Sequence, residues 1–224
     1  LEVSEGEIPA DLYGAYMRNG PNPVFKPRGD YHWFDGDGMV HGVYFRDGRA
    51  SYIRKWVQTR ALHDEIERGK VELSGIMGPY DLSRVAGHEV ESMNPDYCKD
   101  TSNTTLNFHN GKVLSAWYNA GRVYTLDPLT LETAGEQDFC GGLDTPMNAH
   151  GKTDPRTGEF INYGYADFQP WLTYYVISAD GKVKHKPFHH YSMKQAVQER
   201  FILDVLENYV PVDSYYKLIK KIED

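Results

Sequence analysis

The histidines are the first candidates for functional residues, because a histidine ring nitrogen can bind a metal or carry a proton near neutral pH. The sequence contains nine histidines. His150 lies in the segment NAHGK, at a predicted strand beside a turn and among small neighbours. A ring nitrogen at that place could reach a central axis and bind a metal. His150 is therefore the metal-ligand hypothesis that we take forward.

The other histidine positions favour simpler roles. His32 and His41 bracket the segment HWFDGDGMVH, and each could bind a metal. Both fall on a predicted hairpin, where a histidine more often forms a hydrogen bond within the sheet. His189 and His190 are adjacent, so on a strand their side chains point to opposite faces and cannot easily serve one metal.

Other chemistries find less support. Asp35 and Asp37 suggest calcium, but the further oxygen donors and the bidentate glutamate of a calcium loop are absent, so a turn is the better interpretation. Residues 18–23, RNGPNP, favour a rigid turn in which Arg18 donates to backbone carbonyls. The sequence contains no P-loop, no dinucleotide-binding glycine motif and no Ser/His/Asp signature.

The two cysteines, Cys98 and Cys140, form neither a CxxC pair nor a disulfide framework. They have no evident base partner, so we expect both to be small, buried apolar residues. So few cysteines favour a reducing compartment, and we expect a cytoplasmic protein.

Charge and hydropathy limit the partners. Lys and Arg number 24 against 32 Asp and Glu, so the net charge of −8 excludes a nucleic-acid binder. No apolar run approaches the roughly 18 residues of a membrane span, and no signal pattern is visible. Residues 71–80 are the one modest candidate for weak contact with a membrane surface. Its apolar members are Val71, Leu73, Ile76, Met77 and Tyr80.

Turn chemistry predicts the elements that must position these residues. Asp-Gly and Asn-Gly turns between apolar runs are strong hairpin signals. The predicted strands cover residues 31–34, 39–45, 50–59, 104–108, 112–118, 122–126, 131–139, 147–152, 160–165, 171–178 and 182–189, with a further strand favoured at 200–206. Four short strands in roughly 40 residues, without intervening helices, favour an all-β fold and, within it, the blades of a β-propeller.

The length limits this propeller to an incomplete set of blades. A blade takes about 45 residues, so 224 residues give at most about five. We expect one partial propeller domain over residues 1–224, with a frayed or helical tail at 213–224. The first residue is Leu1 and no closing element is visible, which leaves open that the chain is part of a longer protein.

Several long segments resemble the carotenoid cleavage oxygenase family, which includes stilbene oxygenases and retinoid isomerases. The segments are IPADLYGAYMRNGPNP at 8–23, YHWFDGDGMVHGVYFRDGRASYIRKWVQT at 31–59, SNTTLNFHNGKVLSAW at 102–117, YTLDPLTLET at 124–133 and AHGKTDPRTGEFINYGY at 149–165. The resemblance implies a seven-bladed β-propeller with a helical cap and a non-haem iron(II), Fe²⁺, held on the axis by four histidines.

The resemblance also implies an activity: an enzyme, a dioxygenase, that uses O₂ to cleave a conjugated double bond of a carotenoid, apocarotenoid or stilbene. The segment AHGKTDPRTGEF places His150 at the family's first iron ligand. The expected partners are then an apolar small-molecule substrate and O₂. The third and fourth ligands would lie beyond Asp224.

Two positions depart from the family pattern. The family's second ligand lies in a strand that Tyr191 to Glu199 matches without a gap, and Met193 occupies the histidine position. A thioether is a poor ligand for iron(II). Tyr118 stands where the family carries a glutamate that orients a ligand. The alternatives are therefore a member without a working iron site that binds an apolar ligand, or a truncated inactive fragment.

Overall fold

A computed structural model describes residues 1–27, 31–71, 73–75, 99–118, 121–143, 146–165 and 172–185. The chain divides into two compact units, Leu1–Phe188 and His189–Asp224. Every described element belongs to the first unit. The predicted strand at 200–206 and the tail at 213–224 lie outside the described residues, so the single domain over 1–224 stays a prediction.

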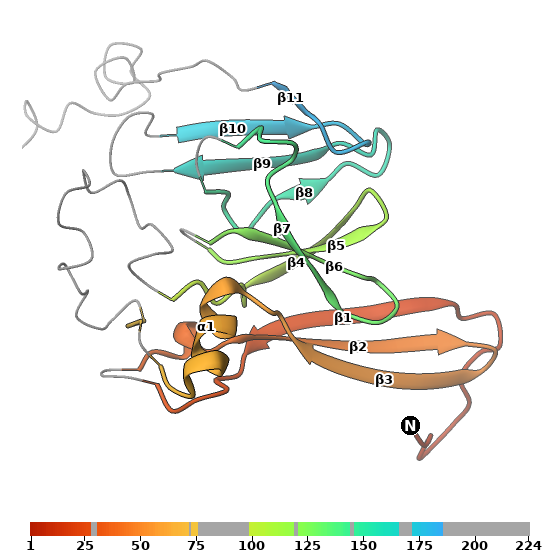
Figure 1. Cartoon of the computed structure of the whole chain (residues 1–224). Coiled ribbons are helices and arrows are strands. Elements are labelled where there is room, and N and C mark those ends of the chain that lie inside the picture. The colour runs from red at the N-terminus through yellow and green to blue at the C-terminus, as the bar shows by residue number, and fades with distance from the viewer. Residues whose placement is uncertain are drawn as a thin grey trace, which may run out of the picture. The chain divides into compact units, whose positions relative to one another are not determined.

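Antiparallel strands form three sheets, which Figure 1 shows. Sheet 1 contains β1 (Gly14–Pro21), β2 (Gly38–Arg46) and β3 (Arg49–Trp56), paired in that order. Sheet 2 contains β4 (Thr105–His109), β5 (Lys112–Ala116), β6 (Val123–Leu126) and β7 (Thr133–Gln137). Sheet 3 contains β8 (Lys152–Thr153), β9 (Phe160–Tyr165), β10 (Leu172–Ile177) and β11 (Val183–His185).

The first strand of each sheet lies next to the first strand of the neighbouring sheet, β1 beside β4 and β4 beside β8. Side chains join the sheets here: Asn19 Nδ2 in β1 donates to the carbonyl oxygen of Ser102, just before β4, at 2.8 Å and to Ser115 Oγ in β5 at 3.0 Å. Thr153 Oγ1 donates to the carbonyl oxygen of Phe108 at 2.9 Å. Three sheets joined along their first strands are consecutive blades, so the propeller prediction is confirmed.

Sheet 2 is buried on both faces, because its side chains alternate between two cores. In β5, Val113 packs toward sheet 1, whereas Leu114 packs toward sheet 3. The core shared with sheet 1 contains Val40, Val57, Val113, Tyr124, Leu126 and Leu131. The core shared with sheet 3 contains Leu114, Ala116, Val123, Phe139, Met147, Ala149, Phe160, Tyr175 and Ile177.

The helix α1 (Arg60–Arg68) follows sheet 1 and was absent from the sequence prediction. Thr59 caps its N-terminus by accepting a hydrogen bond from the backbone N–H of Leu62, and Gly69 ends it in the left-handed conformation, with φ 69°. Its buried face contains one charged residue, Glu65, whose carboxylate pairs with Lys99 at 2.7 Å. Ala61 and Leu62 are its buried apolar residues, and charged residues dominate the segment from Asp64 onward in the sequence.

The predicted strand at 31–34 and the hairpin that followed it are wrong. Trp33–Asp35 form a 3₁₀ helix that His32 caps, and the first strand is instead β1, which includes Arg18 on an exposed stretch of strand. The glycines of Asp35–Gly38 serve close packing rather than positive φ, since Gly36 has φ −70°. A Cβ atom on Gly38 would lie 2.4 Å from the carbonyl oxygen of Ser102.

Two further predictions need correction. The strand predicted at 147–152 is reduced to the two residues of β8, and the residues before them form the turn that carries His150. Cys140 is exposed, not buried, because it lies in the turn after β7 with φ 63°. Cys98 lies outside the described residues. The remaining strands from β2 to β11 lie where the sequence predicts them, within a few residues.

Candidate metal-ligand site at His150

Two asparagine side chains hold the turn that carries His150. Asn148 Oδ1 accepts the backbone N–H of His150 at 2.8 Å, and Asn148 Nδ2 donates to the carbonyl oxygen of Tyr118 at 3.0 Å. Asn162 Nδ2 in β9 donates to the carbonyl oxygen of Asn148 at 2.8 Å. Both asparagines are buried, so the turn is fixed to sheet 2 on one side and to β9 on the other.

Gly151 allows the turn to pack closely on sheet 3. A Cβ atom at this position would lie 2.5 Å from Phe160 Cζ and 2.9 Å from Asn162 Cγ. Phe160 is only 2% exposed, so its ring has no room to move away. The sequence gives a partial signal for this arrangement, because an Asn and a Gly flank Ala149-His150, but it does not identify Asn162 as the second support.

The imidazole of His150 is exposed at this turn. Among the described residues its backbone N–H is bonded, while neither ring nitrogen has a hydrogen-bond partner. An unpaired ring nitrogen on a fixed backbone suits a metal ligand, because its lone pair is available and little backbone freedom remains to be lost. The residues present therefore fit one imidazole ligand of a metal centre.

Tyr118 lies beside this turn, as the hydrogen bond from Asn148 to its carbonyl oxygen shows. Its ring is partly buried and packs on Trp117, with ring centroids 5.5 Å apart, and on Phe34 at 6.1 Å. The structure thus brings Tyr118 and His150 into the same region. Met193, His189 and His190 lie outside the described residues.

The structure gives His32 and His41 structural roles. The ring of His32 accepts a hydrogen bond from the backbone N–H of Phe34 at 3.2 Å, which caps the 3₁₀ helix. His41 lies within β2 and is hydrogen-bonded to the Tyr52 hydroxyl at 2.5 Å. Burial lowers the pKa of His41, with Arg18 adding to the effect, so its neutral form is favoured.

Asp35 and Asp37 are buried by protein contacts of their own. Asp37 contacts the ammonium of Lys99 at 2.7 Å and accepts the backbone N–H of Val24 at 2.9 Å. Asp35 Oδ2 accepts the backbone N–H of His32 at 3.1 Å. These contacts support the interpretation that the pair is structural and not a calcium site.

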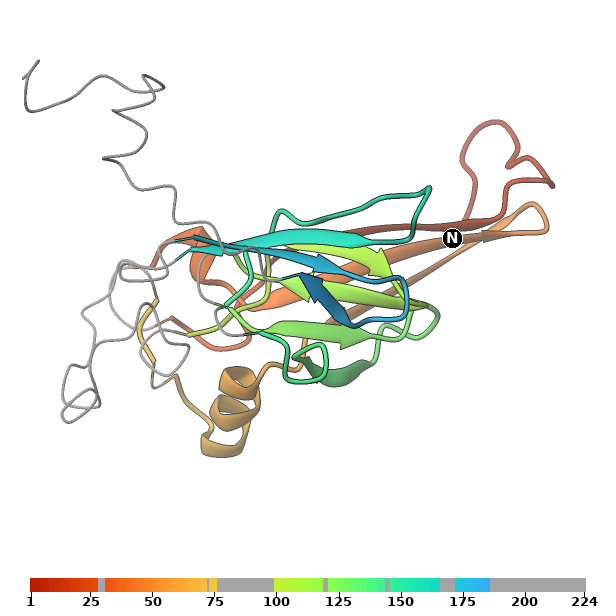
Figure 2. The ribbon, with the colours of Figure 1, turned by 90° about the horizontal axis from the view of Figure 1, so that it is seen from above.

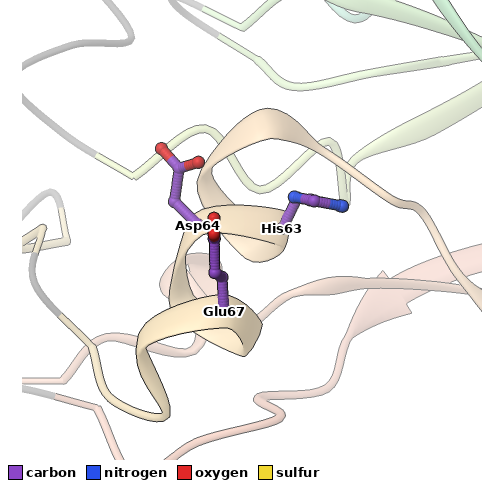
Figure 3. Close-up of side chains that lie close together, drawn as sticks. All are labelled: His63, Asp64 and Glu67. Atoms are coloured by element: carbon purple, nitrogen blue, oxygen red, sulfur yellow. The ribbon is translucent and has the colours of Figure 1, made fainter.

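A group of potential ligands occurs on α1, where His63, Asp64 and Glu67 lie together (Figure 3). One ligand atom from each lies within 4.8 Å of the others. All three side chains are exposed, and residues at this spacing meet on any helix surface. We assign no metal site to these three residues. Within the described residues, no helix combines the length and apolar character that crossing a membrane requires.

Comparison with known proteins places this geometry in a family. The family model described as retinal pigment epithelial membrane protein matches residues 1–204. The carotenoid 9,10(9',10')-cleavage dioxygenase 1 of Phaseolus vulgaris is 38% identical over 193 residues, which are 82% of this chain and 35% of that protein. The isoeugenol monooxygenase of Pseudomonas nitroreducens is 35% identical over 83% of this chain and 38% of its own length.

Solved structures of the same family have a similar fold. The lignostilbene dioxygenase of Pseudomonas brassicacearum superposes with a TM-score of 0.67 at 33% identity, over 81% of this chain and 37% of that one. The cobalt-substituted Synechocystis apocarotenoid oxygenase gives a TM-score of 0.61 at 28% identity, over 82% and 40%. The chain thus spans little more than a third of the length of these relatives. It belongs to the retinal pigment epithelial membrane protein family, the family of the carotenoid cleavage oxygenases.

Proposed function

We propose that this chain is part of a non-haem iron(II) dioxygenase that cleaves a conjugated carbon–carbon double bond with O₂. The substrate class is a carotenoid, an apocarotenoid or a stilbene, and both oxygen atoms end in two carbonyl products. The named activities of the relatives, on carotenoids, isoeugenol and lignostilbene, support this reaction type. We also keep a cytoplasmic location and a weak membrane contact at residues 71–80 as proposals.

The observation that carries the proposal is the unpaired imidazole of His150 on its fixed turn. His150 would bind the iron through a ring nitrogen, and neutral imidazole suits iron(II). The crystal structure of a cobalt-substituted relative supports a metal centre in this fold. Bound iron would supply the site where O₂ is activated.

The chain's own residues would prepare the ligand. Asn148 and Asn162 fix the backbone at His150, so the ring enters the site without a further loss of backbone freedom. The partly buried ring of Tyr118 and the exposed ring of Phe34 lie next to each other, with centroids 6.1 Å apart, and would offer apolar surface to a substrate.

A second candidate function is a family member that has lost iron and binds an apolar ligand without catalysis. Tyr118 and Met193 favour it, because they replace a carboxylate and an imidazole of the family pattern. A truncated, inactive fragment is the third alternative.

Anaerobic titration of the full-length protein with iron(II) distinguishes these functions. We expect one tightly bound iron, which His150→Ala should weaken at least tenfold. His63→Ala is the matched control, because His63 is exposed on α1 and should leave iron binding unchanged. Adding O₂ and a stilbene or apocarotenoid should then give carbonyl products only from the iron-loaded protein.

Unchanged iron binding in His150→Ala would remove His150 from the metal centre. A full-length protein that binds no iron but retains apolar ligands would support the second function instead. The substitution Met193→His tests whether the methionine impairs iron binding. A gain of iron affinity would show that Met193 weakens the site.

A further inference from the structure

A groove of about 1200 Å³ opens between sheets 1 and 2. One wall comes from sheet 1 and the other from β4, β5 and the turn after β6. β1, β2 and β3 extend beyond the ends of the other strands, which leaves part of sheet 1 without a facing strand (Figures 1 and 2). The apolar residues that line the groove are Tyr13, Ala15, Met17, Tyr44, Phe45, Ile53, Leu106, Phe108, Val113, Pro128 and Leu129.

The register of sheet 1 explains why the groove is hollow. Ala15, Tyr44 and Ser51 face one another across the three strands, and the next row along is Met17, Gly42 and Ile53. Side chains in such rows share one face of the sheet. Ala15 and Ser51 have small side chains, so this part of the sheet face leaves space that larger side chains would fill.

Tyr44 fixes the distance between the two walls. Its hydroxyl donates to the carbonyl oxygen of Pro128 at 2.8 Å, across the boundary between the sheets. Met17, Ile53 and Leu106 pack on the buried core between sheets 1 and 2, and this closes the inner end of the groove. The groove therefore has a preformed shape with an apolar inner end.

The mouth of the groove is cationic. Arg46, Asp47 and Arg49 line it, and the guanidinium of Arg46 contacts Asp47 at 3.5 Å. Arg49 is exposed and, among the described residues, has no ion-pair partner. One uncompensated positive charge therefore stands at the open end, beside an apolar interior.

We propose that this groove binds a linear apolar carboxylic acid, with its chain against the apolar walls and its carboxylate at Arg49. An arginine guanidinium matches a carboxylate in shape and charge, and apolar burial drives entry of the chain. The volume exceeds that of common small-molecule pockets, which suits an extended ligand. None of the lining residues supports the turn of His150, so this is a second site, separate from the proposed metal centre.

Fluorescence titration of the full-length, iron-free protein with dansylaminoundecanoic acid tests the proposal. We expect saturable binding with a blue shift, and displacement by dodecanoic acid about tenfold more readily than by dodecanol, because only the acid pairs with Arg49. Ala15→Trp and Ser51→Trp each fill the groove and should weaken binding of both competitors at least tenfold. The assay needs neither iron nor O₂, so its result is independent of the proposed oxygenase function.

Arg49→Glu should remove the preference for the acid while leaving binding of dodecanol unchanged. Arg54→Glu is the matched control, since Arg54 is an exposed residue of the same strand that falls on the opposite face. Far-UV circular dichroism verifies folding of each variant. Absent saturable binding, unchanged affinity in both folded tryptophan variants, or equal losses in Arg49→Glu and Arg54→Glu would each overturn the proposal.

Discussion

Lys99 joins two buried carboxylates that come from distant parts of the chain. Its ammonium lies 2.7 Å from Asp37 Oδ1 and 2.7 Å from Glu65 Oε2, and all three side chains are at most 6% exposed. Burial raises the pKa of Glu65, while the hydrogen bond and charge of Lys99 oppose the rise. The ion cluster thus ties α1 to the start of β2 at a position that water does not screen.

Removing the shared cation should be costly. We predict that Lys99→Met destabilises the protein by about 3 to 5 kcal/mol, because it leaves the two buried carboxylates without their shared cation. Lys55→Met is the comparison, since the Lys55–Glu132 pair is largely exposed at 3.0 Å and should contribute less than about 1 kcal/mol. Urea denaturation measures both. Similar losses in the two variants would contradict the importance of burial.

Asp100 gives the protein a specific pH dependence. Burial raises the pKa of its carboxyl group from 3.8 to about 7, although the backbone N–H groups of Arg122 and Ser102 donate to it and oppose the rise. The folded state therefore keeps a proton that the unfolded state releases near pH 4. The stability that protonated Asp100 contributes to the folded state is fully present below pH 4 and is lost as the pH rises through 7.

We predict that the wild type loses about 2 to 3 kcal/mol relative to Asp100→Asn between pH 5 and pH 8, since the variant has no such proton to release. Denaturation curves of both proteins at the two pH values measure the difference. A constant difference would show that Asp100 titrates alike in the folded and unfolded states.

At the scale of elements, the short turn before β8 depends on one glycine. Gly151→Ala would place a methyl group 2.5 Å from the buried ring of Phe160, so the turn that carries His150 must shift. We predict a loss of about 1 to 3 kcal/mol, as for other overpacked sites. Iron affinity of the full-length protein should also fall. Gly20→Ala in β1 is the control, because no atom lies within 4 Å of its added methyl group.

Equal behaviour of the two alanine variants would show that the turn tolerates the shift. The contrast between them does not depend on glycine flexibility, since neither residue has positive φ. It depends on the distance to the neighbouring element, which is a property of the tertiary structure.

Across the whole of the unit Leu1–Phe188, sheet 2 couples the other two sheets, because its strands contribute side chains to both cores. Leu126 in one core and Ile177 in the other are both fully buried. We predict that Leu126→Ala and Ile177→Ala each cost about 2 to 5 kcal/mol and shift the same unfolding transition. Fluorescence of the buried Trp117 and far-UV circular dichroism should follow it together. Two separated transitions in either variant would mean that the sheets unfold independently.

The sequence by itself determined the fold class and most strands from β2 onward, and it proposed His150 as a metal ligand. Alternating apolar residues between Gly-containing turns encode hairpins locally, and a local code can be recognised without the rest of the chain. The long motifs that resemble the family are the basis for the expected oxygenase chemistry.

Only the tertiary structure decided the features that depend on neighbours distant in sequence. The segment Asp35–Gly38 resembles a hairpin turn, yet Gly36 packs closely on Pro21 and Gly38 on the backbone at Ser102. The buried face of α1 is held by the ion pair between Glu65 and Lys99. The support of His150 by Asn162 and the hollow above Ala15 likewise arise where separate strands meet. Such contacts join residues that are far apart along the chain, so no local sequence pattern could predict them.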